Sequence, residues 1–97
     1  MRVVITDPAE ADLENIWRWI ARTHPLNGAR YVAKLRDRAE SLAGLPRKGR
    51  PRDDIAAGCR ALTMDFFLIV YRIRDDTVEV LRIIDGRQDL DESDPSS

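Results

Sequence analysis

The residues of this chain that could do chemistry are mostly arginines. The sequence has 16 basic residues, of which 14 are arginine, and it has a single histidine, His24, and a single cysteine, Cys59. Arginine presents a rigid fork of donors that matches carboxylate and phosphate groups, so this composition favours anionic partners. The second half of the chain gathers the cations in a turn with several helix breakers and along strand-like runs. They are Arg47, Lys48, Arg50, Arg52, Arg60, Arg82 and Arg87.

Other kinds of chemistry lack the residues that they need. The histidine and the cysteine form no cluster, and the dispersed carboxylates lack the spacing of metal ligands, so we expect neither a metal nor a cofactor. Cys59 has no base or oxyanion pattern near it, and we interpret it as a buried or half-buried strand thiol. One cysteine excludes an internal disulfide and fits a reducing compartment. No apolar run approaches the roughly 18 residues of a membrane span and no segment has a signal-peptide pattern, so we expect no membrane partner and a cytoplasmic location.

Length and composition predict one globular domain. A chain of 97 residues suits a single core, and 43% apolar with 34% charged residues is typical of a globular protein. The last nine residues carry four carboxylates and no base, so residues 1–88 hold 16 basic and 13 acidic residues although the whole chain has a net charge of −1. We therefore place the domain at residues 1–88 and expect residues 89–97 to form a mobile acidic tail.

The chain begins as a strand followed by an amphipathic helix. Residues 2–6 are β-rich. Asp7 is expected to cap the helix, and Glu10 stands where a capping-box carboxylate belongs. The apolar spacing of the helix places Trp17 in the core. The predicted stripe consists of Ala9, Leu13, Ile16, Trp17 and Ile20.

A second helix and three strands follow. Residues 23–25 break the first helix, because proline disfavours helical geometry in the residue before it, and the second helix runs to about residue 45. So short a break predicts an antiparallel helical hairpin. Strand-like runs near residues 58–60, 66–74 and 78–87 give the order β-α-α-β-β-β, with the last two paired through a tight turn. We predict an α+β fold with two layers, in which the hairpin covers one face of a three-stranded antiparallel sheet.

Six segments form an ordered set: residues 6–16, residues 45–46 (LP), residues 49–52 (GRPR), Arg60, residues 69–73 (IVYRI) and residues 80–84 (VLRII). This set resembles the ParE toxins of the ParE/RelE superfamily, over residues 3 to about 90. The resemblance implies a bacterial type II toxin with a helical hairpin on a small sheet, neutralised by a cognate antitoxin that is encoded beside it. ParE-like toxins are understood to stall DNA gyrase on cleaved DNA, whereas RelE-like relatives cut mRNA on the ribosome.

The chain departs from this family pattern at the end of the last strand. ParE-like chains often have His-Gly-x-Arg there, and residues 85–88 read Asp-Gly-Arg-Gln. Asp85 stands at the histidine position and Gln88 at the arginine position, with Arg87 one place earlier. Functions carried by those two positions stay open, and a non-toxic module that only binds its antitoxin remains an alternative.

The residues indicate a toxin that acts by binding its target rather than by cutting RNA. Cleavage of RNA through its 2′-hydroxyl needs a base, a donor for the leaving oxygen and cations on the phosphate. The chain has no tyrosine after Tyr71 and no lysine after Lys48, and Leu68 fills a strand position where the ribonucleases have arginine. His24 lies in the helix break, far from the expected sheet. Poisoning needs only preferential binding to one state of the target, so we expect no enzyme activity; a RelE-like ribosome-dependent mRNA interferase is the alternative.

We assign two sets of residues to partners. Exposed aromatic residues are typical interface anchors, and Trp19 lies roughly 110° from the apolar stripe of its helix. For Arg50 and Arg60, ion pairing within the chain is the competing interpretation. The antitoxin set is Trp19, Tyr31, Arg60 and Arg82, and the target set is Arg47, Lys48, Arg50, Arg52 and Arg87.

The antitoxin is expected to form a hetero-oligomer with the toxin. It would lay a helix against the hairpin and an extended segment across the sheet. Contact with DNA is expected only through this complex, because no helix concentrates bases and polar readers on one face.

Overall fold

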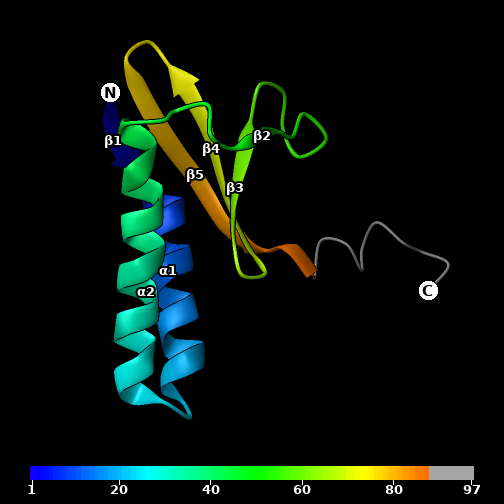
Figure 1. Ribbon diagram of the computed structural model, residues 1–97. Coiled ribbons are helices and arrows are strands. Elements are labelled where there is room, and N and C mark those ends of the chain that lie inside the picture. Colours follow the sequence, from blue (N-terminus) through cyan, green and yellow to red (C-terminus); the bar gives the residue numbers. More distant parts are fainter. Residues whose placement is uncertain (88–97) are drawn as a thin grey trace, which may run out of the picture.

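A helical hairpin lies against one face of a β-sheet in the computed structural model, which describes residues 1–87 (Figure 1). The fold is α+β with two layers, as the sequence predicts, and the hairpin projects beyond the sheet at the end where the helices meet (Figure 1). The elements are β1 (Arg2–Ile5), α1 (Asp7–Ala21), α2 (Pro25–Glu40), the 3₁₀ turn η1 (Ser41–Ala43), β2 (Arg50–Pro51), β3 (Arg60–Met64), β4 (Phe67–Arg74) and β5 (Thr77–Asp85).

Thr6 occupies the N-cap of α1, so the prediction that Asp7 caps this helix is wrong. The Thr6 side chain makes no cap hydrogen bond, because its hydroxyl donates to the carbonyl oxygen of Val80 at 2.7 Å. Glu10, which has the capping-box position in the sequence, binds Arg36 on α2 instead. The polar groups at the start of α1 therefore connect the helix to the sheet and to α2.

The two helices approach each other closely at Gly28. A Cβ atom added there would lie 3.1 Å from the Trp17 carbonyl oxygen and 3.3 Å from the Ala21 amide nitrogen. Leu13 and Ile16 follow the predicted stripe and are buried, but Trp17 is 41% exposed. The expectation that Trp17 lies in the core is wrong, because helices this close leave no room for an indole between them.

The sheet has five strands in the order β1-β5-β4-β3-β2. It is mixed, so the expected three-stranded antiparallel sheet is too small. β1 runs parallel to β5, with Arg2 opposite Thr77 and Ile5 opposite Val80. β2 adds two residues to the outer side of β3. The predicted antiparallel pairing of β4 with β5 through residues 75–76 is confirmed.

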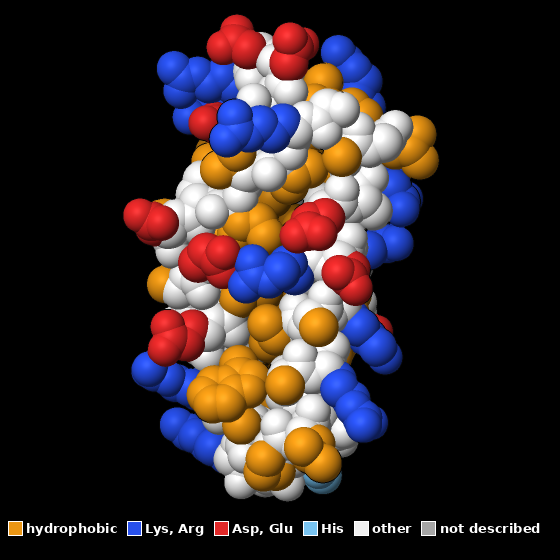
Figure 2. Space-filling model, turned by 90° about the vertical axis from the view of Figure 1, so that its left-hand side faces the viewer, with side chains coloured by type: hydrophobic (Ala, Val, Ile, Leu, Met, Phe, Trp, Pro, Cys, Tyr) orange, Lys and Arg blue, Asp and Glu red, His pale blue; other side chains and the backbone are white. Residues whose placement is uncertain are grey.

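The core fills the space between the hairpin and the sheet. β4 contributes Phe67, Ile69 and Tyr71, and β5 contributes Val78 and Val80. On the outer face of the hairpin, hydrophobic side chains follow the seam between the helices, with charged side chains on both sides (Figure 2). Within residues 1–87, no helix is long and apolar enough to cross a membrane. The predicted acidic tail and Gln88 lie outside the described residues.

Candidate functional site

A loop that carries basic side chains, residues 45–50, connects η1 to β2 and is held against the sheet by Tyr71 and Arg60. The Tyr71 hydroxyl donates to the carbonyl oxygen of Pro46 at 2.7 Å and accepts the Gly49 N–H at 2.9 Å. The Arg60 guanidinium donates to the carbonyl oxygen of Gly49 at 2.8 Å and to that of Arg47 at 3.3 Å. Side chains from β3 and β4 thus fix the backbone of the loop.

Gly49 allows the backbone of the loop to lie close to Tyr71. A Cβ atom at Gly49 would lie 2.7 Å from the Tyr71 ring and hydroxyl and 2.9 Å from the Ala61 carbonyl oxygen. Burial raises the pKa of the Tyr71 hydroxyl above its ordinary value, which keeps the phenol protonated and able to donate to Pro46. The loop is therefore pre-organised before any partner arrives, which lowers the entropic cost of binding.

Three cations project from this loop, and we call them the loop cations: Arg47, Lys48 and Arg50. All three are exposed, and none has a side-chain hydrogen bond or ion pair with any of the residues that the structure describes. Leu45, which is 63% exposed, lines a shallow hollow of about 390 Å³ with Pro46, Arg47 and Lys48. The loop thus offers cations that need break no ion pair, next to an apolar surface.

The other two residues of the predicted target set lie on a different surface. Arg52 pairs with Asp54 at 2.9 Å, and Arg87 pairs with Asp85 at 3.1 Å. The Arg87 guanidinium also lies 3.6 Å from the centre of the Phe66 ring, a cation–π contact. Arg52 and Arg87 line one hollow of about 220 Å³ at the sheet face away from the hairpin. Asp85 therefore holds Arg87 in place.

The predicted antitoxin set is divided: Trp19 and Tyr31 line two adjoining hollows that share Ile20 and His24, whereas Arg60 and Arg82 line neither. Trp19, at the projecting end of the hairpin, is 53% exposed. The Tyr31 hydroxyl donates to Asp65 at 2.8 Å, and its ring packs on Phe67. Arg60 donates to carbonyl oxygens of the loop, as described above, and not to a carboxylate. The ion pair considered for it is therefore not found among the described residues.

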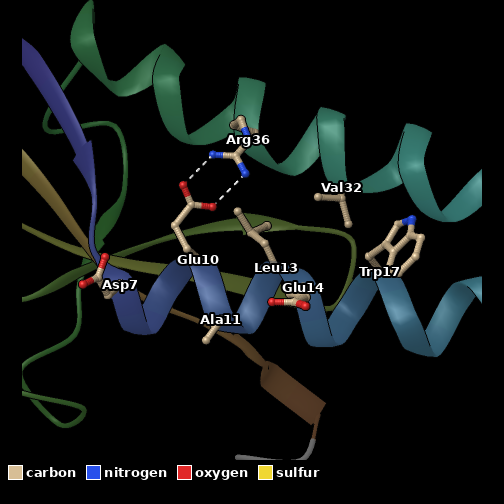
Figure 3. Close-up of a pocket in the computed structure, with 8 residues that line it drawn as sticks. All are labelled: Asp7, Glu10, Ala11, Leu13, Glu14, Trp17, Val32 and Arg36. Atoms are coloured by element: carbon tan, nitrogen blue, oxygen red, sulfur yellow. Dashed lines mark hydrogen bonds and ion pairs between the residues drawn. The ribbon is translucent and has the colours of Figure 1, made fainter.

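Sequence reasoning missed a groove on the outer side of the hairpin (Figure 3). It has a volume of about 500 Å³, and Trp17 and Val32 give it an apolar end. Glu10 and Arg36 cross it with two hydrogen bonds of 2.7 and 2.9 Å. The Arg36 guanidinium keeps the pKa of Glu10 below its ordinary value. Gly28 was the sequence signal that could have predicted the groove. A small residue in α2 allows α1 to pack closely, and this packing turns Trp17 outward.

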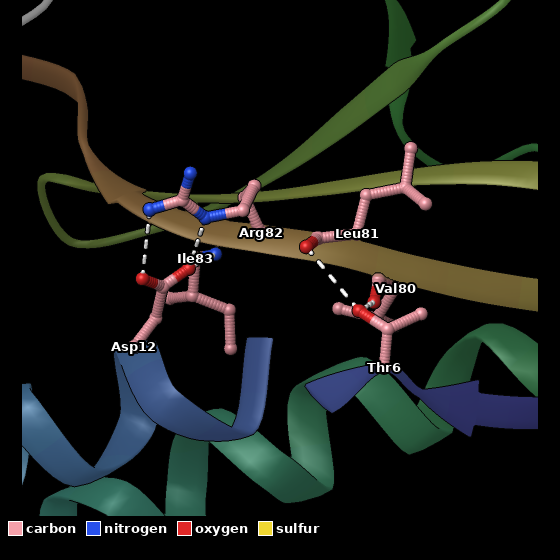
Figure 4. A network of polar contacts seen from close by, with 6 residues as sticks. All are labelled: Thr6, Asp12, Val80, Leu81, Arg82 and Ile83. Carbon is pink, nitrogen blue, oxygen red and sulfur yellow. Dashed lines mark hydrogen bonds and ion pairs between the residues drawn. The ribbon is translucent and has the colours of Figure 1, made fainter. Parts of the chain in front are cut away.

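Arg82 lies on the opposite side of α1 from this groove, at the outer edge of β5. Its guanidinium donates to both carboxylate oxygens of Asp12, at 2.7 and 2.9 Å (Figure 4). Asp12 also accepts the Ile83 N–H at 2.9 Å. This part of β5 lies beyond its pairing with β1, so Asp12 and Arg82 cover a sheet edge that has no strand beside it.

Tyr71 is a titratable side chain that contacts the loop, and its hydroxyl is engaged with Pro46 and Gly49. His24 is the N-cap of α2, where the two helices meet, and this end of the helices lies opposite the loop (Figure 1). Residues 1–87 contain no group of three or more His, Cys, Asp or Glu side chains that could hold a metal ion. The loop can therefore bind an anionic or apolar partner through positioned cations and Leu45.

Comparisons with known proteins agree over nearly the whole chain. The family model described as the ParE toxin of the type II toxin–antitoxin system parDE matches residues 3–90. The chain is 33% identical to Toxin ParE3 of Caulobacter vibrioides, over 92% of this chain and 90% of the relative. It is 30% identical to Toxin ParE1 of Mycobacterium tuberculosis, over 93% of this chain and 94% of the relative.

A solved structure has the same fold. It is described as a chromosomal ParDE TA system from P. aeruginosa, and it matches with a TM-score of 0.76 over 86% of this chain and 92% of that chain. Its sequence identity is 24%, so this likeness concerns the fold alone.

Proposed function

Because this chain belongs to the ParE family of toxins of type II toxin–antitoxin systems, we propose that it arrests growth by binding DNA gyrase and that a cognate antitoxin neutralises it. The toxin acts as a poison rather than as an enzyme: it binds one state of gyrase more tightly than the others and so accumulates that state. The state that the toxin binds is gyrase that holds cleaved DNA.

The observation that carries this proposal is the pre-organised loop with its three loop cations. Tyr71 and Arg60 fix the loop backbone, and the cations are exposed and unpaired among the described residues. Such a surface binds an acidic or phosphate-bearing partner without breaking ion pairs of its own. The hollow between Arg52 and Arg87 on the sheet would extend the contact.

A RelE-like mRNA interferase is the second candidate. It would need a proton donor and acceptor near the cations. His24 is the N-cap of α2, at the end of the hairpin that lies far from the loop (Figure 1). The Tyr71 hydroxyl is already engaged with Pro46 and Gly49. These positions favour binding over RNA cleavage.

The antitoxin is proposed to place a helix in the outer groove, where Trp17 and Val32 would receive apolar side chains. Trp19 stays a proposed second anchor from the antitoxin set. Trp17→Ala and Trp19→Ala should each weaken binding of the cognate antitoxin by more than about 1 kcal/mol, measured by calorimetry. An unchanged dissociation constant for either variant would remove that tryptophan from the interface.

Gyrase and ribosome assays run side by side test the target. The purified chain should trap cleaved DNA in a gyrase reaction and leave mRNA intact in a ribosome-dependent cleavage assay. Lys48→Ala/Arg50→Ala should reduce trapping at least about tenfold. The matched control is Arg2→Ala/Arg74→Ala, which removes two exposed cations that have no ion pair within the described residues.

The outcomes separate the hypotheses. Cut mRNA with normal supercoiling would replace the gyrase proposal with the interferase. No effect in either assay, together with tight antitoxin binding, would identify a non-toxic binding module. Equal loss of trapping in the two double variants would mean that net charge matters and the loop does not.

A further inference from the structure

The end of the hairpin that projects beyond the sheet has an unusual charge distribution. Residues 15–36 contain no aspartate or glutamate, although 17 carboxylates are present in the chain. In Figure 2 the acidic side chains lie over the upper and middle parts of the molecule, whereas basic side chains continue toward the lower end, where the helices meet. This end of the molecule therefore carries positive charge that no neighbouring carboxylate in the segment offsets.

Two hollows meet on this end of the hairpin, and together we call them the hairpin-tip hollow. One has a volume of about 370 Å³ and the other about 390 Å³, and they share the side chains of Ile20 and His24. Neither is lined by a carboxylate. The lining of the two together is Trp19, Ile20, Arg22, Thr23, His24, Asn27, Arg30, Tyr31 and Lys34.

Three cations of the hairpin-tip hollow are available to a ligand. Arg22, Arg30 and Lys34 are exposed and make no side-chain hydrogen bond or ion pair with the residues in 1–87. The other arginines of the segment are engaged, Arg18 with Glu14 at 2.6 Å and Arg36 with Glu10 at 2.7 Å. At the edge of this hollow the Tyr31 hydroxyl donates to the Asp65 carboxylate at 2.8 Å.

An aromatic side chain completes the hollow. Trp19 is 53% exposed, and it lines the same hollow as Arg22. Cations that follow a phosphate backbone, together with an aromatic face on which a base can stack, are the two features that bind single-stranded nucleic acids. A polyanion without rings, such as polyglutamate, would satisfy the cations but would give the exposed indole no flat partner.

We propose that the hairpin-tip hollow binds single-stranded nucleic acid, with Arg22, Arg30 and Lys34 on the phosphates and Trp19 stacked on a base. Contacts to phosphates carry no sequence information, so the binding is independent of sequence. This direct contact adds to the indirect contact through an antitoxin complex that the sequence suggests. The hollow is lined by residues on both sides of the hairpin turn, and this turn and the loop of residues 45–50 lie at opposite ends of the helices (Figure 1). One toxin could therefore hold a protein and a nucleic acid together.

The test needs neither gyrase nor antitoxin, so its failure is distinct from failure of the proposed function. A fluorescently labelled, mixed-sequence single-stranded DNA oligonucleotide is titrated with the full chain at several salt concentrations, and anisotropy gives the dissociation constant. Trp19→Ala should weaken binding about fivefold or more, since stacking of one base contributes on the order of 1 kcal/mol or more. In a Trp17→Phe background, where Trp19 is the only tryptophan, the oligonucleotide should quench the fluorescence.

Salt dependence tests the cations. The logarithm of the association constant falls as the logarithm of the salt concentration rises. Arg22→Ala/Arg30→Ala should make this slope less steep by about 1.4, because each phosphate contact on a single strand contributes about 0.7. Arg2→Ala/Arg74→Ala removes the same charge elsewhere and should leave the slope unchanged. Polyglutamate of similar length serves as a polyanion without bases.

Three results would overturn the proposal. The first is a salt dependence that is equally steep for Arg22→Ala/Arg30→Ala and for Arg2→Ala/Arg74→Ala. The second is binding of polyglutamate as tight as that of the oligonucleotide, which would assign the surface to an acidic protein. The third is an oligonucleotide affinity that Trp19→Ala leaves unchanged.

Discussion

Gly49 is the residue on which the geometry of the basic loop depends. Gly49→Ala would place a Cβ atom 2.7 Å from the Tyr71 ring and hydroxyl, and overpacking of this kind costs about 1–3 kcal/mol. A lower melting temperature by several degrees is expected in calorimetry. Gly44→Ala is the control, because its Cβ would meet nothing closer than 3.9 Å. Equal melting temperatures for the two variants would mean that the loop is not tightly held by Tyr71.

Both tyrosines make stability depend on pH in alkaline solution. Burial raises the pKa of Tyr71 and of Tyr31, and Asp65 adds to the effect at Tyr31. In the unfolded chain a phenol ionises near pH 10, so above this pH the unfolded state binds fewer protons than the folded state. The free energy of unfolding should therefore be unaffected below about pH 10 and should fall as the pH rises further.

Denaturant titrations between neutral and alkaline pH measure this fall. Tyr71→Phe and Tyr31→Phe should each remove part of it, and ultraviolet absorbance should show less phenolate in folded than in unfolded protein at the same pH. The prediction would be contradicted if the two tyrosines ionised at the same pH in the folded protein as in the unfolded chain.

At the scale of the element, the outer edge of β5 depends on Asp12. Its carboxylate is 12% exposed and accepts the Ile83 N–H, whereas the Arg82 side chain is 55% exposed. Asp12→Ala leaves that amide without its acceptor and should cost about 1–3 kcal/mol. Arg82→Ala removes an exposed ion pair and should cost less than about 1 kcal/mol. Urea denaturation of both variants measures the difference, and a larger loss for Arg82→Ala would mean that the ion pair matters more than the amide.

The elements differ in how far the sequence could predict them. The helical hairpin and the pairing of β4 with β5 follow from local signals, namely the apolar period, Pro25 and the turn at residues 75–76. The parallel pairing of β1 with β5 joins segments far apart in the chain, and a β-rich run carries no information about its partner. β2 is two residues long and contains Pro51, so it has no strand pattern to recognise.

The candidate site shows the same limit. The cations of the site could be predicted from composition and spacing. Which of them form ion pairs and which do not could not be predicted. Arg52 and Arg87 have carboxylates two residues away, which the sequence suggests. Arg82 is paired with Asp12, and Arg60 is engaged with carbonyl oxygens of the loop. Both arrangements require the fold, as does the outward turn of Trp17.

At the scale of the whole molecule, net charge is divided between the domain and residues 89–97. Deletion of residues 89–97 changes the net charge from −1 to +3, since 16 basic and 13 acidic residues remain. The shortened chain should elute from a heparin column at higher salt, because a positive body attracts polyanions at longer range. The control keeps the length and carries Asp89→Asn, Asp91→Asn, Glu92→Gln and Asp94→Asn, and it should shift equally. Elution that shifts only on deletion would assign the effect to length and not to charge.

The parallel pairing of β1 with β5 also concerns the time at which the toxin becomes active in the cell. Residues 2–5 leave the ribosome well before their partners, residues 77–80, which are among the last part of the domain to be made. At about 5–20 residues per second, several seconds of translation separate the two strands. A growing chain therefore has an incomplete sheet and no finished support for the loop of residues 45–50, so the toxin domain is complete only after β5 has been made.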